Sequence, residues 1–160
     1  MNDASLHELA SLLPQAAPMI LLTGLGPDTA EDSAEAEVAI TPDSPFFDVS
    51  QDGVPACVAL EYMAQTMALV VGRARRRRGL PPKVGFVLGS RRLETFVPRF
   101  RNGLRYRVRA TCTYEDESFG SFDCAVTGPE GAYVARATLT AFQPDGEMDF
   151  QETEIGRAHV

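Results

Sequence analysis

One carboxylate stands out in the longest apolar segment of the chain. Residues 54–78 read VPACVALEYMAQTMALVVGRARRRR, with Glu61 as the one acid and Gln65 four positions further on. A carboxyl group enclosed by apolar side chains is costly unless it is hydrogen-bonded or functional. Two interpretations follow from this segment. Glu61 either faces solvent on an amphipathic helix, or acts as a general acid or base inside the protein.

The spacing of the apolar residues predicts that this segment is one long helix. They recur every three or four positions, as on one buried helical face: Leu60, Met63, Met67, Val70, Val71 and Ala74. Pro55 suits the first helical position, and Gly79 followed by a Pro-Pro pair predicts the end. We therefore expect a helix over 54–78. Free N–H groups at its start, that of Ala56 included, could receive a carbonyl oxygen.

The rest of the chain is predicted to form mostly strands. Alternating patterns occur at 33–40, 84–88 with its continuation 91–97, 104–114, 121–127 and 132–142. Their hairpin spacing predicts an antiparallel sheet wrapped around the one long helix, an α+β fold. We expect a single domain over 1–144. The acidic tail 145–160 is expected to be disordered, and its last seven residues, EIGRAHV, resemble a translated sequencing adapter and look foreign.

Composition argues against several classes of protein. The net charge of −7 argues against nucleic acid as a partner. No apolar run is long enough to span a bilayer, and the N-terminus lacks the order of a signal peptide. The three cysteines, Cys57, Cys112 and Cys124, form no C-x-x-C pair. They are typical of reduced core thiols in a cytoplasmic protein.

The histidines restrict the chemistry further. The chain has two, His7 near the N-terminus and His159 in the suspect tail. A Ser-His-Asp or Cys-His triad therefore has no base in the body of the chain, and a zinc site lacks clustered ligands. Neither of the common phosphate-binding glycine motifs is present. We expect no metal and no cofactor.

The helix sequence carries a family resemblance. Residues 55–65 resemble the central-helix signature of the β-hydroxyacyl-acyl-carrier-protein dehydratases, hotdog-fold proteins of fatty-acid synthesis. The segments 12–14, 18–22 and 45–47 resemble the same family. In detail the chain is more similar to the dehydratase-like proteins of aryl-polyene pigment clusters, through 54–65, 85–91 and 142–144. The resemblance implies a hotdog dimer that acts on a 3-hydroxyacyl thioester, carried by the phosphopantetheine arm of an acyl carrier protein.

The resemblance also implies roles for particular residues. Glu61 would be the acid/base group, Gln65 would orient it, and the N–H of Ala56 would polarise the thioester carbonyl. The acyl tunnel would be lined by four further residues: Cys57, Ala64, Phe86 and Leu88.

The chain departs from the family in the loop before the helix. The family places a histidine there, which acts with the glutamate across a dimer interface, whereas residues 48–53 read DVSQDG. β-Elimination needs both a base and an acid. Asp48 or Asp52 could replace the histidine, or a second dehydratase-like chain could supply it in a heterodimer rather than a homodimer. Alternatively, the chain is a non-catalytic acyl-binding or scaffold subunit, or a hotdog thioesterase whose helix carboxylate activates water.

Five arginines follow the apolar part of the helix: Arg73, Arg75, Arg76, Arg77 and Arg78. They either form a solvated helix end favoured by the helix dipole, or dock an acidic carrier protein by electrostatic attraction.

Overall fold

The computed structural model describes residues 3–13, 19–27, 29–81, 83 and 85–143. The helical elements are α1 (Asp3–Leu12), the 3-10 turn η1 (Ala56–Val58) and α2 (Ala59–Arg77). The strands are β1 (Gly24–Leu25), β2 (Ser33–Ala39), β3 (Gly53–Pro55), β4 (Phe86–Thr95), β5 (Arg99–Arg101), β6 (Arg105–Glu115), β7 (Phe119–Thr127) and β8 (Tyr133–Phe142). The predicted tail, 145–160, lies outside the described residues, so the boundaries of the single domain stay a prediction.

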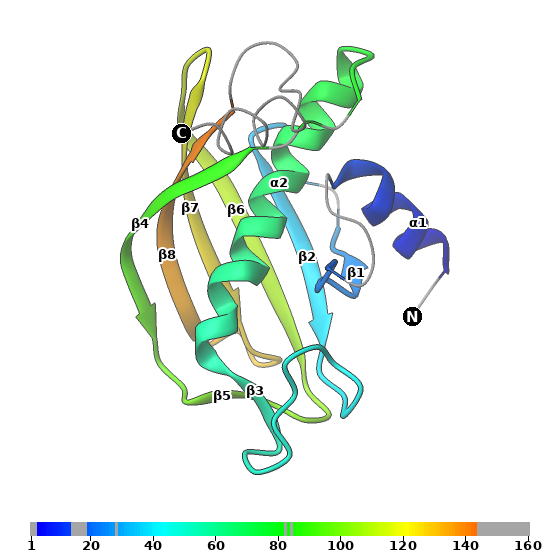
Figure 1. The fold of residues 1–160 in the computed structure, drawn as a ribbon, viewed down its shortest axis with the longest axis vertical. Coiled ribbons are helices and arrows are strands. Elements are labelled where there is room, and N and C mark those ends of the chain that lie inside the picture. Colours follow the sequence, from blue (N-terminus) through cyan, green and yellow to red (C-terminus); the bar gives the residue numbers. More distant parts are fainter. Residues whose placement is uncertain (1–2, 14–18, 28, 82, 84, 144–160) are drawn as a thin grey trace, which may run out of the picture.

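Six of the described strands form one large sheet around α2, as predicted. Its order is β1-β2-β6-β7-β8-β4, with antiparallel neighbours, and β3 and β5 form a separate antiparallel pair. Figure 1 shows α2 lying along one face of the curved sheet, with α1 beside it near β1. The helix packs on β2, β6, β7 and β8. Because the sheet covers α2 along most of its length, polar groups on α2 need partners inside the protein.

The start of the helix differs from the prediction. Val54 and Pro55 belong to β3, and the α-helix begins only at Ala59, after η1. The cause is tertiary, because β3 pairs with β5 and so fixes the backbone of Val54 opposite Phe100. Pro55 precedes the first helical turn with φ −56° and ψ 143°, an extended conformation.

The end of the helix is the predicted one. Gly79 adopts φ +72°, a left-handed conformation that suits glycine. Its N–H donates to the carbonyl of Arg76, and the N–H of Leu80 donates to that of Arg75. These two bonds form a Schellman motif, which satisfies helix-terminal carbonyls.

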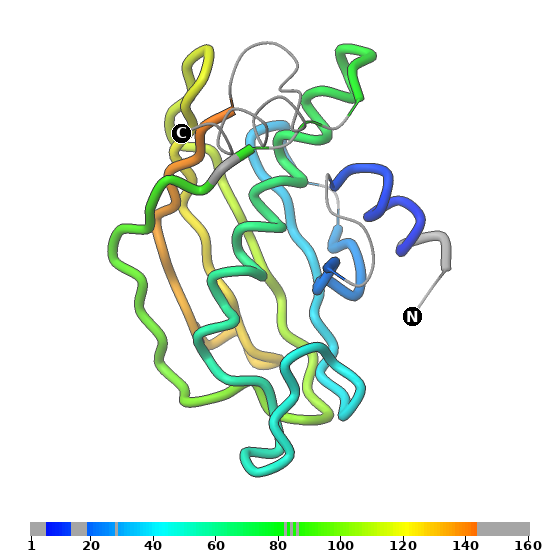
Figure 2. The backbone as a smooth tube through the Cα atoms, viewed as in Figure 1, coloured from blue at the N-terminus to red at the C-terminus, as the bar shows by residue number. Residues whose placement is uncertain are grey.

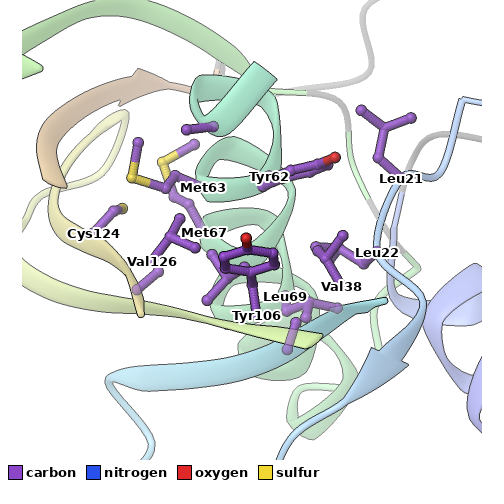
Figure 3. Packing of buried hydrophobic residues seen from close by; sticks show 14 of the residues in the cluster. Leu21, Leu22, Val38, Tyr62, Met63, Met67, Leu69, Tyr106, Cys124 and Val126 are labelled. Atoms are coloured by element: carbon purple, nitrogen blue, oxygen red, sulfur yellow. The ribbon is translucent and has the colours of Figure 1, made fainter. Parts of the chain in front are cut away.

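The core lies between α2 and the sheet. Tyr62, Met63 and Leu69 are at most 2% exposed, and Figure 3 shows such side chains packed against residues of β2, β6 and β7. Phe100 joins the two sheets, with its ring 5.2 Å from that of Tyr62 and 5.0 Å from that of Tyr106, both edge-on. Such aromatic contacts add specific geometry to the area that they bury.

One strand prediction needs correction. The alternation over 104–114 predicts that Tyr106, Val108 and Tyr114 share one buried face. Tyr106 and Val108 are buried, but Tyr114 is 60% exposed. The pairing of β6 with β7 shifts by one residue between Cys112 and Tyr114. Such a bulge moves the following side chains to the other face.

The contact between α1 and α2 gives a stability prediction. A Cβ atom on Gly72 would lie 2.4 Å from the carbonyl oxygen of Leu12. Helix propensity alone favours Ala over Gly by about 1 kcal/mol, whereas overpacking costs about 1–3 kcal/mol. We expect Gly72→Ala to lower the free energy of unfolding by about 1–2 kcal/mol, as measured by urea denaturation. Gly89→Ala is the control, since a Cβ there meets nothing within 4 Å; a stabilised Gly72 variant would contradict the contact.

Candidate active site

A cavity of about 350 Å³ lies between α2 and the ends of β4, β7 and β8. On α2 it is lined by residues at three- and four-residue spacings, among them Glu61, Ala64, Ala68 and Gly72. At 1.5 Å per residue, this stripe is about 16 Å long. Small side chains on the stripe leave room for a long, narrow ligand, and Glu61 stands at one end.

The remaining walls of the cavity are mostly apolar, and its far end is polar. Val87, Phe122 and Ala141 come from β4, β7 and β8, while the turn 115–118 contributes three carboxylates and a serine. Gly85, Val87 and this turn were not predicted as site residues. Because residues 86–88 are all apolar, the sequence pattern did not indicate which of their side chains faces the helix. The turn gave none because its approach to α2 depends on the β6–β7 hairpin.

Glu61 is half-buried and is held by Gln65. The Nε2 atom of Gln65 donates to Oε1 of Glu61 over 3.1 Å and to the carbonyl of Met19 over 2.7 Å. The N–H of Leu21 donates to Oε1 of Gln65 over 2.9 Å. The side chain of Gln65 is fully buried, and each group of its amide has a partner. The structure thus brings the two predicted polar residues of the helix into direct contact.

The loop before the helix projects from the end of the sheet (Figure 2) and is fixed by its own hydrogen bonds. The carboxylate of Asp48 accepts from the hydroxyl and the N–H of Ser50 and from Nε2 of Gln51. These donors, the Ser50 hydroxyl first, lower the pKa of Asp48. Asp52 accepts from Nδ2 of Asn102 over 3.0 Å. Neither aspartate lines the cavity with Glu61, so their geometry does not favour either one as the missing partner.

The prediction of a free N–H group at Ala56 is wrong. This group donates to the carbonyl of Pro98 over 3.2 Å, because it continues the β3–β5 ladder one residue beyond Pro55 and Arg99. In this structure it is therefore not available to a thioester carbonyl. The sequence held no signal for the pairing of residues more than forty positions apart.

The four predicted tunnel residues have different positions. Ala64 lines the cavity. Cys57 is exposed at the first helical turn, and Leu88 is 56% exposed; neither lines this cavity. Leu88 is the extra residue at an irregularity in the β4–β8 pairing, between Val87 and Gly89, where the regular alternation of side chains is interrupted. The side chain of Phe86 lies outside the described part of the chain, so its role stays a prediction.

Two of the five arginines at the end of α2 already bond to other groups of the chain. Nε of Arg75 donates to the carbonyl of Pro81 over 2.6 Å. Arg76 bonds to the hydroxyl of Ser11 and lies 3.8 Å from Glu8 on α1. Arg77 lines a separate groove together with the acidic residues Glu31 and Asp32 before β2 and Glu115 at the end of β6. Arg73 and Arg78 have no ion pair with any residue that the structure describes.

Other reactive groups lie away from the cavity. His7 is exposed on α1 and does not line it. Burial raises the pKa of Cys124 to about 12, which fits a core thiol, whereas Cys57 is exposed rather than part of the core. Among the described residues no group of His, Cys, Asp and Glu could hold a metal ion. None of the described helices is long and apolar enough to cross a membrane.

Comparison with known families gives the decisive observation. Residues 7–153 match the ApeP-like family, described as ApeP dehydratase. The chain belongs to the ApeP dehydratase family. This confirms the resemblance to the dehydratases of aryl-polyene clusters and the predicted hotdog fold, with its antiparallel sheet around one long helix. The dehydratase-type assignment is confirmed with it.

Solved structures agree with the ApeP family assignment. A chain of the dehydratase heterocomplex ApeI:P from Xenorhabdus doucetiae is 28% identical, with a TM-score of 0.78 over 86% of this chain and 91% of that chain. A hypothetical thioesterase with coenzyme A from Streptococcus pneumoniae is 15% identical, with a TM-score of 0.59 over 76% and 85%. The E. coli PaaI protein of the phenylacetic acid degradation operon is 12% identical, with a TM-score of 0.57 over 72% and 79%.

The thioesterase likenesses are too distant to show more than the fold, so they do not favour the hydrolase alternative. Among curated protein sequences, none matches this chain.

The hydrogen bonds of Asp48 give a prediction for pH. Its pKa is lowered in the folded state, so its stabilising contribution is present above the unfolded value of about 3.9 and is lost as the pH falls through the folded value. We expect Asp48→Ala to lower the free energy of unfolding at pH 7, and the difference from the unaltered protein to shrink below about pH 4. Urea denaturation across pH measures this. Asp43→Ala, an exposed change in the same loop, should show no such trend; an Asp48 effect independent of pH would contradict the argument.

Proposed function

We propose that this ApeP-family chain is one subunit of a dehydratase for 3-hydroxyacyl groups on an acyl carrier protein, in aryl-polyene-type synthesis. The observation that carries the proposal is the position of Glu61. Its carboxylate stands at one end of a long, mostly apolar cavity and is anchored by a buried amide. That combination supports a role for Glu61 in proton transfer, beside a cavity that we propose holds the acyl chain.

The reaction needs two proton-transfer events. A base removes a proton from the α-carbon, the α-carbon electron pair forms the double bond, and the β-hydroxyl leaves as water after an acid protonates it. Glu61 supplies one of these groups. At the Glu61 end of the cavity the described part of the chain offers no second one: the three carboxylates of the turn 115–118 line the polar far end, His7 does not line the cavity, and Asp48 is bonded within its own loop.

We propose that a second, histidine-bearing dehydratase-like subunit supplies the other group in a heterodimer. The 28% identical chain comes from a dehydratase heterocomplex, which supports this arrangement over a homodimer. The edge strand β4 offers a surface for such a partner. Its outer side has no strand neighbour among those described, and Leu88 and Leu93 are each more than 40% exposed. Unpaired, apolar edges favour pairing with another chain.

The carrier protein is the second proposed partner. Acyl carrier proteins are acidic, and Arg73 and Arg78 are the members of the arginine cluster with no ion pair among the described residues. The residue Arg77 faces an acidic groove, which weakens its attraction for an acidic partner.

The absence of disulfides among the three cysteines supports a reducing compartment and hence a cytoplasmic reaction.

Replacing Glu61 tests the catalytic assignment. In the complex with its histidine-bearing partner, Glu61→Gln should lower the rate of dehydration at least 100-fold, because the amide cannot transfer the proton. The measurement is formation of the enoyl thioester from a 3-hydroxyacyl carrier protein. Glu130→Gln, an exposed change in the 128–131 turn, should leave the rate unchanged.

Three results would contradict the proposal in different ways. Full activity of the Glu61 variant would refute its catalytic role. Equal rates with and without the partner would refute the need for a second subunit. Release of free thiol without an enoyl product would favour the hydrolase, and no turnover in any combination would favour the scaffold.

Charge reversal tests the docking of the carrier protein. Arg73→Glu combined with Arg78→Glu should weaken binding of the carrier about tenfold at low ionic strength, and the loss should shrink as salt is added. Binding is measured by fluorescence anisotropy of a labelled carrier protein. Arg136→Glu reverses an exposed charge between the buried Ala135 and Ala137 on β8, on the side of the sheet away from its core, and should have no effect; an equal loss there would show that only net charge matters.

A further inference from the structure

The cavity and the neighbouring groove share one wall. The cavity that contains Glu61 has a volume of about 350 Å³, and the groove that contains Arg77 has a volume of about 380 Å³. Three residues line both spaces: Val71, Glu115 and Phe122. Val71 belongs to α2 and Phe122 to β7, two elements that pack on each other. We name the side chains of Val71 and Phe122 the partition, because they separate the cavity from the groove.

The ring of Phe122 is the larger part of the partition. It is 3% exposed, and it lies back along β7 over Gly120, where a Cβ atom would be 2.8 Å from Cε2 of the ring. Residues two apart on a strand share a face, and Gly120 also lines the cavity. A side chain at residue 120 would therefore displace the ring. Glycine at this position lets the ring lie between β7 and α2.

The partition lies far along the helix from Glu61. Val71 is ten positions after Glu61, which corresponds to about 15 Å at 1.5 Å per residue. An extended chain advances about 1.2 Å per covalent bond, because the three backbone bonds of a peptide residue span about 3.6 Å. An acyl chain that starts beside Glu61 therefore reaches the partition after about 12 bonds.

Beyond the partition, the two ways onward differ. Straight ahead lies the turn 115–118, whose three carboxylates would lose water to an apolar chain without gaining a hydrogen bond. Figure 1 shows this turn at the same end of the molecule as the C-terminal end of α2. Sideways lies the groove, whose wall on α2 is apolar and consists of Val70, Val71 and Ala74. The ring of Phe122 blocks this second way.

We propose that Phe122 sets the upper limit on the length of the acyl chain, because its ring prevents the chain from passing out of the cavity into the groove. This rests on the proposed function, since it assumes that the cavity holds an acyl chain. Phe122 would contact the end of a long chain and not the reacting carbons. It therefore determines specificity and takes no part in proton transfer, and a chain that ends before the partition does not contact it.

The test compares two straight 3-hydroxyacyl chains in the complex with the histidine-bearing partner. A chain of about 8 carbons ends before the partition, and one of about 18 carbons extends past it. Phe122→Ala removes the ring, and Phe122→Leu is measured beside it because leucine keeps more of the buried apolar volume. Val126→Ala is the matched control, since Val126 is buried on the same face of β7 but lines neither space.

The expected results are changes in the ratio of kcat/KM for the long chain to that for the short chain. In the unaltered complex the long chain should be about tenfold worse or more, within the range of about 10- to 200-fold that hydrophobic pockets show for small differences in substrate size. Phe122→Ala should raise the ratio about tenfold, and Phe122→Leu should raise it by less. Equal values for the two chains in the unaltered complex, a ratio that Phe122→Ala leaves unchanged, or an equal rise in Val126→Ala would overturn the proposal.

A binding measurement separates this inference from the proposed function. Saturated acyl-pantetheines of the same two lengths lack the 3-hydroxyl group and cannot be dehydrated; they are titrated into the complex by calorimetry. The long one should bind about tenfold more weakly than the short one, and Phe122→Ala should remove the difference. If binding follows this pattern but no 3-hydroxyacyl chain is dehydrated, the proposed function fails and the length limit holds. If the short chain is dehydrated but Phe122→Ala changes neither binding nor turnover of the long chain, the length limit fails instead.

Discussion

The structure depends on the enclosure of a single helix by its sheet. α2 is covered along most of its length, so a polar side chain on it must find a hydrogen-bond partner inside the protein or remain unpaired at a cost of about 1–3 kcal/mol. Gln65 meets this demand with three bonds, to Leu21, Met19 and Glu61. The same constraint that stabilises the fold therefore also holds the carboxylate at the cavity. The buried amide of Gln65 thus contributes both to the packing of the fold and to the position of Glu61.

The cavity follows from the sizes of the side chains on the helix. Where large residues such as Tyr62, Met63 and Leu69 face the sheet, the interior is filled. On the adjacent stripe, Ala64, Ala68 and Gly72 leave space between α2 and β4. A close-packed interior does not keep such space without a reason, since voids forfeit contact energy. One stripe of the helix thus packs the core, and the other lines the cavity in which we propose that the acyl chain binds.

Our proposal makes the chain catalytically incomplete by itself. It keeps the helix carboxylate of a dehydratase, but its loop at 48–53 is closed by hydrogen bonds of its own, with the carboxylate of Asp48 committed to Ser50 and Gln51. Strand β4 lies at the edge of the sheet, carries exposed apolar residues, and has no outer strand neighbour among the described residues. Within the ApeP family, these features agree with a subunit that gives its glutamate to a shared site, and whose partner gives the histidine.

The sequence by itself determined the period-3.6 helix with its Gly79 stop, the antiparallel strands, and Glu61 with Gln65 one turn away, because these are local patterns. It also carried the family resemblance, through the residues of that helix. Only the tertiary structure decided the rest. Pairing of β3 with β5 shortened the helix and occupied the N–H of Ala56, and a bulge turned Tyr114 outwards. Val87 rather than Leu88 lines the cavity, beside an irregularity in the pairing of β4 with β8. The hydrogen bonds of Gln65 to Leu21 and Met19 belong to this second group, since hydrogen bonds between segments more than forty residues apart leave no periodic trace in either segment.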